Sequence, residues 1–179
     1  VIYGSPISII GNGVVVDPEA LLSEISYLKD KGIEPKLLVS DRCHIIMPYH
    51  IELDSALSGH QAELAAGSTG RGIAPVYADK MFRNGIRMID LLEPDILKQK
   101  LEKGYAFAKG IIEKSLNKKM ISEPDSIFQD YIDFGIKLKD YVSDTSVELY
   151  KAHKNGKSIL FEGAQGISLD VDHGIYPYT

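Results

Sequence analysis

The sequence has 179 residues, of which 44% are hydrophobic and 25% are charged, and its formal net charge is −5. A chain of this length and composition is long enough for one domain with a hydrophobic core and is not typical of a disordered protein. The negative charge argues against a general binder of nucleic acid or of membrane surfaces. It does not exclude a small anionic ligand, because such a ligand needs only local positive charge and hydrogen-bond donors.

Other global features narrow the class of protein. The single cysteine, Cys43, excludes an internal disulfide framework and is typical of a reducing compartment. No run of about 18 apolar residues is present, so we expect no membrane span. The sequence starts without a methionine or a secretory signal, and it stops soon after a loop that is rich in functional residue types. We therefore expect the chain to be an internal part of a longer protein.

The first part of the chain has the pattern of a parallel sheet. Residues 8–10 read Ser-Ile-Ile and precede a glycine-containing turn, which predicts a short strand. Asp17-Pro18 is a typical helix start, apolar residues follow at helical spacing, and Gly32 should end the helix. Residues 36–40 predict a second strand. Because a strand–helix–strand unit builds a parallel sheet, we predict an α/β fold with a mostly parallel sheet and flanking helices.

The remaining chain is predicted to be mainly helical. We expect residues 45–66 to be partly helical and residues 67–90 to be mostly loop and short strand. Amphipathic spacing predicts a long helix over residues 93–116 and a second over residues 124–153. A last strand is expected at residues 158–161.

The strongest local signal is residues 67–75, which read Gly-Ser-Thr-Gly-Arg-Gly-Ile-Ala-Pro. Glycines allow close approach of the backbone to a ligand and positive φ angles, and successive amides in such turns bind anions. Ser68 and Thr69 add hydroxyl groups, and Arg71 adds a planar guanidinium suited to phosphate. We interpret this segment as one wall of a phosphate-binding site. The alternative is a mobile surface loop of ordinary linker composition.

Two arginines, Arg83 and Arg87, follow soon after this loop. They are four residues apart, and Arg83 precedes an Asn-Gly turn from which a side chain can project. From the spacing alone, a solvated basic face is the favoured interpretation.

The segment after the last predicted strand carries two groups of polar side chains. Gln165 lies where ligands collect in open α/β sheets, and its amide could contact a base edge. Glu162 could instead act as an acid near a metal, and a tight turn with a capping amide is a third interpretation. Asp170, Asp172 and His173 are potential metal ligands, but a hydrogen-bonded loop explains them at least as well. We predict no metal site there.

Other tempting patterns carry no site. Gly156-Lys157-Ser158 resembles the end of a P-loop, but residue 151 is lysine where that motif needs glycine, and the segment follows a helix rather than a strand. Cys43 has no obvious base partner. The other histidines have no ligand spacing, and we expect them to be core or surface residues: His44, His50, His60 and His153.

Four motifs, taken together and in order, resemble those of the adenylosuccinate synthetase family. They are SIIGNGVV at residues 8–15, STGRGI at 68–73, FEGAQG at 161–166 and LDVDHGIYP at 169–177. The resemblance implies an incomplete P-loop-NTPase-like fold. It also implies that residues 1–179 are the central part of a single domain, with a helical subdomain at residues 91–157.

The resemblance further implies a GTP-dependent ligase of purine (AMP) biosynthesis. Members of the family join aspartate to IMP with Mg²⁺, through a 6-phosphoryl-IMP intermediate, as cytoplasmic homodimers. By resemblance, Thr69 lies at the IMP phosphate and Gln165 contacts the bound IMP near its reacting centre. Arg83 matches the arginine that crosses the dimer interface to the partner subunit's IMP phosphate, which differs from the basic-face interpretation.

Several functional segments of the family have no counterpart in this sequence. The missing parts include the phosphate loop with the catalytic aspartate and Mg²⁺ ligands, the segment with the catalytic histidine, and the guanine-recognition segment. We therefore assign no catalytic and no metal-binding residue here, and we expect the isolated chain to be inactive because phosphoryl transfer depends on positioning and charge neutralisation. The competing hypotheses are an IMP-binding or regulatory module without catalysis, and a structural piece whose helices serve only assembly.

Overall fold

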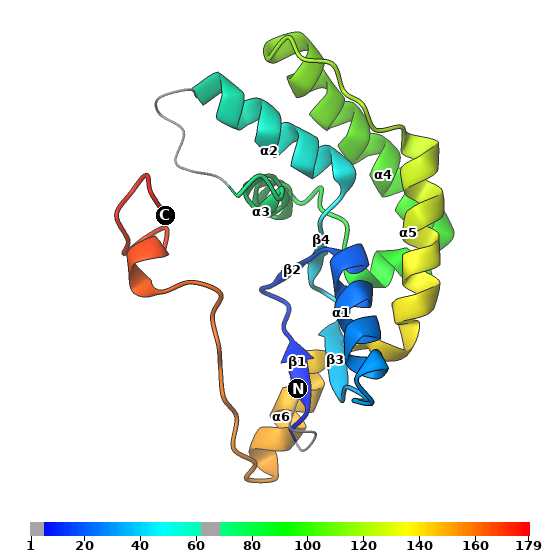
Figure 1. Cartoon of the computed structure of the whole chain (residues 1–179), viewed down its shortest axis with the longest axis vertical. Coiled ribbons are helices and arrows are strands. Elements are labelled where there is room, and N and C mark those ends of the chain that lie inside the picture. The colour runs from blue at the N-terminus through cyan, green and yellow to red at the C-terminus, as the bar shows by residue number, and fades with distance from the viewer. Residues whose placement is uncertain (1–5, 62–68) are drawn as a thin grey trace.

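The computed structural model describes residues 6–61 and 69–179. Its parallel sheet has the strand order β1-β3-β5, formed by β1 (Ser8–Ile10), β3 (Leu37–Ser40) and β5 (Val142–Ser143) (Figure 1). A second parallel pair joins β2 (Val15–Val16) and β4 (His44–Ile45). The predicted α/β class with a parallel sheet is confirmed.

Helix α1 (Pro18–Asp30) forms as its sequence predicts. The Asp17 carboxylate accepts hydrogen bonds from the amides of Glu19 and Ala20 at 3.0 and 3.1 Å, which satisfies two donors of the first turn. Gly32, with φ of +73°, follows the helix end. The helix buries Leu21 and Ile25 and packs against the later helix α5.

The prediction for residues 67–90 was wrong in its main part, since helix α3 (Ile73–Phe82) occupies the middle of this range. Pro75 lies in the first turn of α3, where a missing amide costs no helical hydrogen bond. Helix α2 (Pro48–Gln61) precedes it, and the 3₁₀ helix η2 (Met88–Leu92) follows. The expected short strand is reduced to an isolated antiparallel bridge between His44 and Arg87.

Of the two long helices predicted from the sequence, one forms as expected and the other is interrupted. The first is confirmed, because α4 (Pro94–Lys109) continues into the π-helical turn η3 (Gly110–Ser115). The second is interrupted: α5 (Pro124–Leu138) and the 3₁₀ turn η4 (Lys139–Tyr141) lead into β5, and only then does α6 (Thr145–Lys154) begin. Pairing of Ser143 with Ser40 and capping of α6 by the Asp144 carboxylate outweigh the helical spacing.

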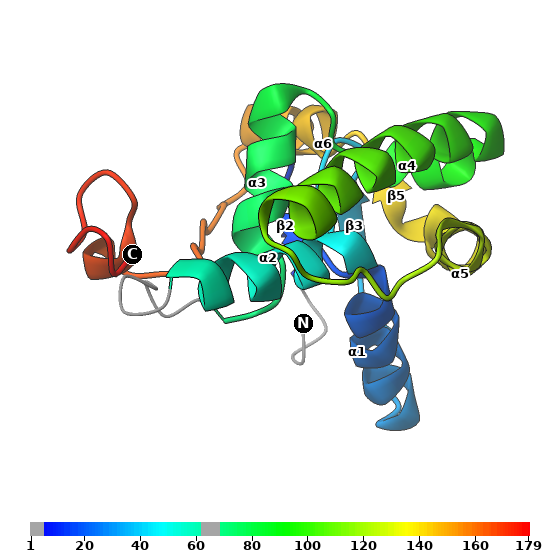
Figure 2. The ribbon, with the colours of Figure 1, turned by 90° about the horizontal axis from the view of Figure 1, so that it is seen from above.

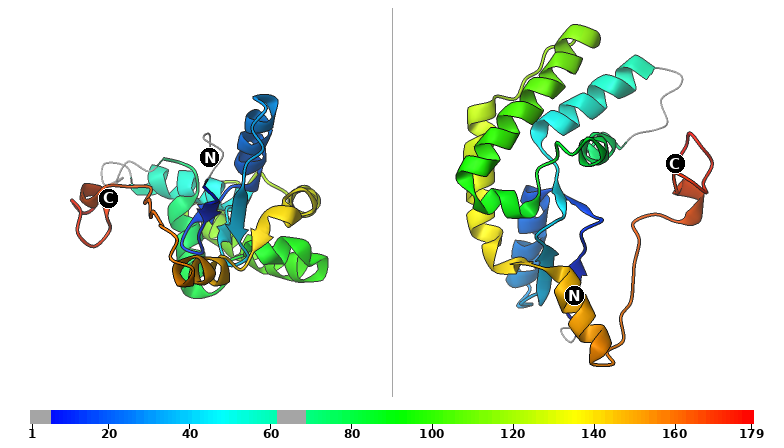
Figure 3. Two further views of the ribbon diagram at one scale, coloured as in Figure 1. Left: turned by 90° about the horizontal axis from the view of Figure 1, so that it is seen from below. Right: turned by 180° about the vertical axis from the view of Figure 1, so that it is seen from behind.

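The strand predicted at residues 158–161 does not form in this structure. Leu160 is 91% exposed and Phe161 is 80% exposed, and no strand lies beside them in the described part of the chain. In Figure 1 the segment leaves the end of α6 and turns back toward the level of α3, apart from the packed helices, and it carries the short 3₁₀ helix η5 (Ile167–Leu169). Figure 3 (right) shows α4 and α5 on one side of the molecule and this segment on the other.

The hydrophobic core lies where α5, α4, α1 and η2 meet the sheet. Figure 2 shows α4 and α5 side by side, and both contact η2. Val39, Leu97 and Leu138 are fully buried there. The Tyr131 hydroxyl of α5 donates a 2.7 Å hydrogen bond to the Ile46 carbonyl, which fixes the chain just before α2. No helix among the described residues is long and apolar enough to cross a membrane.

Candidate functional site

The glycine-rich segment leads directly into the N-terminus of α3. Gly67 and Ser68 lie outside the described residues, whereas Thr69 and Arg71 are exposed. Gly72 is the N-cap with φ of +77°, and a Cβ there would lie 2.9 Å from the Ile51 amide nitrogen. Gly72 is therefore required both for its conformation and for the close approach of this turn to α2.

A buried carboxylate anchors this turn. The Gly72 amide donates a 2.8 Å hydrogen bond to Asp54 of α2, which is 4% exposed. Gly72, the N-cap residue, has no side chain with which to cap the first turn of α3. Because the first amides of a helix have no partners within it and carry the positive end of the dipole, this end favours an anion. Thr69 and Arg71 stand immediately before it.

Arg83 marks the opposite end of the same helix. It is the C-cap of α3, with φ of +65°, a conformation that glycine or asparagine usually occupies. Since a helix rises about 1.5 Å per residue, the length of α3 separates Arg83 from Gly72 by roughly 15 Å. The structure therefore does not bring Thr69 and Arg83 of one chain together.

Gln165 lies in the exposed C-terminal segment. It lines a surface cavity of about 310 Å³ together with neighbouring glycines, Asp170 and His173. The hydrogen bonds of residues 158–179 within the described chain all remain inside this segment. Gln165 is therefore not joined to the turn at Thr69.

The Asp170 region is a hydrogen-bonded loop. The Asp170 Oδ1 atom accepts from the amides of Asp172 and His173 and lies 2.9 Å from the His173 Nδ1 atom. The contact with His173 holds the pKa of the Asp170 carboxyl below its usual range. Among the described residues, no group of three or more histidine, cysteine or acidic side chains is placed to hold a metal ion.

Two buried polar residues of α2 were not predicted to matter. His50 and Asp54 are four residues apart, so they share one face of α2, and both contact α3. His50 pairs with Asp79 at 3.0 Å, and Asp54 binds Gly72. Their partners lie 29 and 18 residues away, so no local sequence pattern reveals them.

Further contacts attach α3 to the loop after β1. The Tyr77 hydroxyl donates to the Gly13 carbonyl at 2.8 Å, and the Lys80 ammonium lies 3.4 Å from the Asn12 carbonyl. Helix α3 is thereby connected to both α2 and the carboxyl end of β1.

Two buried titratable side chains near α3, Cys43 and His44, have pKa values that do not suit a nucleophile or an acid–base catalyst. Burial raises the pKa of the Cys43 thiol to about 12, so it remains protonated. Burial, followed by the charges of Lys80 and Arg87, lowers the pKa of His44 to about 4. Its Nδ1 atom has no hydrogen-bond partner in the described part of the chain. His44 is therefore a neutral core residue, which is one of the two positions, core or surface, that the sequence left open.

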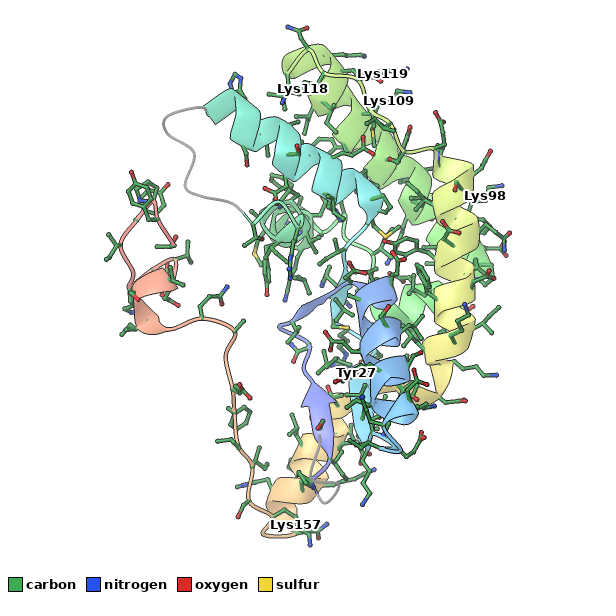
Figure 4. The ribbon with its side chains drawn as sticks, viewed as in Figure 1. Tyr27, Lys98, Lys109, Lys118, Lys119 and Lys157 are labelled. Atoms are coloured by element: carbon green, nitrogen blue, oxygen red, sulfur yellow. The ribbon has the colours of Figure 1, made fainter. Side chains whose placement is uncertain are left out.

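The most visible basic side chains lie elsewhere. Figure 4 shows Lys98 and Lys109 on α4, and Lys118 and Lys119 just after η3, projecting from the outer surface. They do not surround the start of α3 and form an ordinary solvated face.

The whole chain is similar to known proteins. A family-level profile described as adenylosuccinate synthetase matches residues 1–179. Adenylosuccinate synthetase from Clostridium acetobutylicum is 47% identical over 182 residues, and the one from Streptococcus gordonii is 44% identical over 180 residues. Both alignments cover 100% of this chain and 42% of the relative, so the chain spans about two fifths of those proteins. The structure of fully ligated adenylosuccinate synthetase from Plasmodium falciparum matches 98% of this chain and 41% of its own, with a TM-score of 0.84 and 29% identity.

Proposed function

This chain belongs to the adenylosuccinate synthetase family, and on that premise we propose that the protein carrying it joins aspartate to IMP with GTP, giving adenylosuccinate for AMP biosynthesis. The proposed route passes through 6-phosphoryl-IMP, with Mg²⁺, in a cytoplasmic homodimer. We also keep the proposal of a single domain containing a helical subdomain at residues 91–157.

The observation that carries the proposal is the glycine N-cap at the start of α3, directly after Thr69 and Arg71. Gly72 adopts positive φ, and the turn is held on α2 by the buried Asp54. A helix N-terminus with a neighbouring hydroxyl and guanidinium suits a phosphate monoester, and the dipole contributes about 0.3–1 kcal/mol for an exposed anion. We assign this end of α3 to the IMP phosphate, with Thr69 as its hydroxyl donor.

Arg83 is assigned to the phosphate in the partner subunit. Its position at the far end of α3 prevents it from sharing the phosphate bound near its own Thr69. Met81 and Phe82 beside it are 69% and 63% exposed, and neighbouring exposed apolar side chains are typical of a subunit interface. A second copy of the chain therefore fits this end of α3.

Gln165 is assigned to the purine of IMP by family resemblance. Its side chain is exposed, and its amide can both donate and accept hydrogen bonds. In the part of the chain that the structure describes, no group of three or more histidine, cysteine or acidic side chains is placed to hold a metal ion, so we derive no step through Mg²⁺ and name no catalytic acid or base in this chain.

Kinetics of the complete gene product test the proposal. Thr69→Val should raise the KM for IMP about tenfold, since a hydrogen bond to a charged group contributes about 1.5–3 kcal/mol, whereas Thr69→Ser should remain close to the wild type. The KM values for GTP and aspartate should change little. An unchanged KM for IMP in Thr69→Val would contradict the assignment.

The alternative function is an IMP-binding or regulatory module without catalysis. Adenylosuccinate formation by the complete gene product decides between the two. The isolated 179-residue chain should form none, because it lacks the family's phosphate loop and catalytic residues. Saturable heat on titration of a catalytically silent gene product with IMP would favour the module.

A further inference from the structure

A buried polar pair joins the first turn of α2 to the last turns of α3. His50 is 1% exposed and Asp79 is 7% exposed, and the His50 Nε2 atom lies 3.0 Å from the Asp79 Oδ2 atom. The His50 Nδ1 atom accepts a 3.0 Å hydrogen bond from the Met47 amide. Since the neutral ring has one donor and one acceptor, Nε2 carries the proton and donates to the Asp79 carboxylate.

Asp79 holds the turn that contains Arg83. Its main-chain carbonyl accepts the amides of Asn84 and Gly85 at 2.9 and 3.2 Å, in addition to the Arg83 amide. Gly85 in turn packs against the ring of the buried His44. Asp79 therefore fixes the turn through its main-chain carbonyl, and His50 fixes the side chain of Asp79.

The backbone of this turn sets the position from which the Arg83 side chain projects. Within the described part of the chain, no salt bridge or hydrogen bond holds its guanidinium. Its left-handed backbone is strained for a residue with a Cβ atom, and such strain persists only where the surroundings enforce it. The surroundings here are the hydrogen bonds to Asp79.

We propose that the His50–Asp79 pair is a positioning device that fixes the turn at Arg83 so that its guanidinium meets the partner subunit's ligand phosphate; this rests on the proposed function of Arg83. His50 and Asp79 are positioning residues that do not touch the substrate. A purely structural pair, which caps α2 and joins two helices, would instead affect stability alone.

Two substitutions of His50 separate these roles. In His50→Asn the amide oxygen occupies nearly the place of Nδ1 and keeps the Met47 contact, but the side chain is too short to reach Asp79. In His50→Gln the amide nitrogen occupies nearly the place of Nε2 and keeps the donor to Asp79. The measurements are KM for IMP and kcat of the complete gene product.

The expected pattern is specific to IMP. Arg83→Ala should raise the KM for IMP about tenfold. His50→Asn should raise it about threefold or more, with little change in kcat or in the KM for GTP, and His50→Gln should return it toward the wild-type value. Because His50 acts through Arg83, adding His50→Asn to Arg83→Ala should raise the KM no further.

Ile127→Val is the matched control for lost stability. It removes a methyl group from a buried position of α5 and should lower Tm without changing the KM for IMP. If His50→Asn behaves like this control, or if its effect multiplies with that of Arg83→Ala, the pair is only structural and the inference is overturned. If Arg83→Ala itself leaves the KM unchanged, the proposed function of Arg83 fails, and the inference fails with it. Should His50→Asn not fold, Asp79→Asn, which keeps the hydrogen bond without its charge, gives a smaller rise in the same design.

Discussion

Arg83→Gly separates the conformational cost of Arg83 from the use of its side chain. The residue adopts φ of +65° at the end of α3. A left-handed conformation costs about 1–2 kcal/mol for a residue with a Cβ atom, whereas glycine loses about 0.5–1 kcal/mol more backbone entropy on folding. The difference predicts a protein that is more stable by about 0.5–1 kcal/mol.

The same substitution removes the guanidinium. A charge-assisted hydrogen bond contributes about 1.5–3 kcal/mol, so affinity for IMP should fall about tenfold to a hundredfold. A more stable but weaker-binding variant is the signature of a residue kept for function at the expense of the fold.

The assay is thermal unfolding of the complete gene product together with titration by IMP. Asn117→Gly is a suitable control, because Asn117 has φ of +51° and lies outside the proposed site. Since asparagine tolerates this conformation, the control should change stability by only a few tenths of a kcal/mol and leave IMP binding unchanged. Unchanged IMP binding in Arg83→Gly, or a loss of stability above about 1 kcal/mol, would refute the reasoning.

Three further predictions concern the packing around α2 and α3. Tyr49→Phe should leave the free energy of unfolding in urea unchanged or raise it by up to about 1 kcal/mol. The reason is that the buried Tyr49 hydroxyl has no hydrogen-bond partner in the described chain and lies against Gly104. A clear loss of stability would show that the hydroxyl does have a partner. Gly72→Ala should cost more than about 2 kcal/mol from strain and contact with α2. Gly70→Ala, with similar φ but no described atom within 4 Å of an added Cβ, should cost only about 1–2 kcal/mol; equal losses would show that the close contact is unimportant. His44 has a pKa of about 4 in the folded protein and 6.5 when unperturbed, so its stabilising contribution is complete above pH 6.5 and is lost as pH falls toward 4, by about 3 kcal/mol in all. His44→Leu should flatten this part of the curve of stability against pH, and an unchanged slope would contradict the role of His44.

Local signals predicted the elements whose determinants are close in sequence. Asp17 and Pro18 begin α1, and the alternation of strand, helix and strand predicts the parallel sheet of β1 and β3. The helix after residue 93 also follows from its spacing. In each case the residues that cap the element or set its apolar spacing belong to the element itself or lie directly beside it.

The wrongly predicted elements are those whose structure depends on contacts with residues far away in the sequence. Helix α3 begins at a left-handed glycine and has a proline in its first turn, and in the sequence both residues indicate a loop. The helix start is fixed by a contact from another helix, in which Asp54 accepts a hydrogen bond from the Gly72 amide. The break at β5 exists because residues 142–143 pair with β3, about 100 residues away, and no local spacing predicts that pairing.

For the candidate site too, the sequence predicted the local feature but not the contacts between distant residues. Thr69 lies beside a helix start that favours anions, as the glycine-rich loop indicates. Within this chain, neither Arg83 nor Gln165 lies beside Thr69. The sequence did not predict the left-handed backbone of Arg83. The pairing of His50 with Asp79 depends on the packing of two helices and could be found only in the structure.

The central claim is that one IMP phosphate is shared by Thr69 of one subunit and Arg83 of the other. Mixing Thr69→Val and Arg83→Ala subunits, each impaired alone, tests it most directly. In a mixed dimer one site combines both defects, while the other has native Thr69 and native Arg83. With random pairing in equal amounts, the account predicts recovery of about a quarter of wild-type activity at low IMP. Activity no higher than the average of the two variants would contradict it.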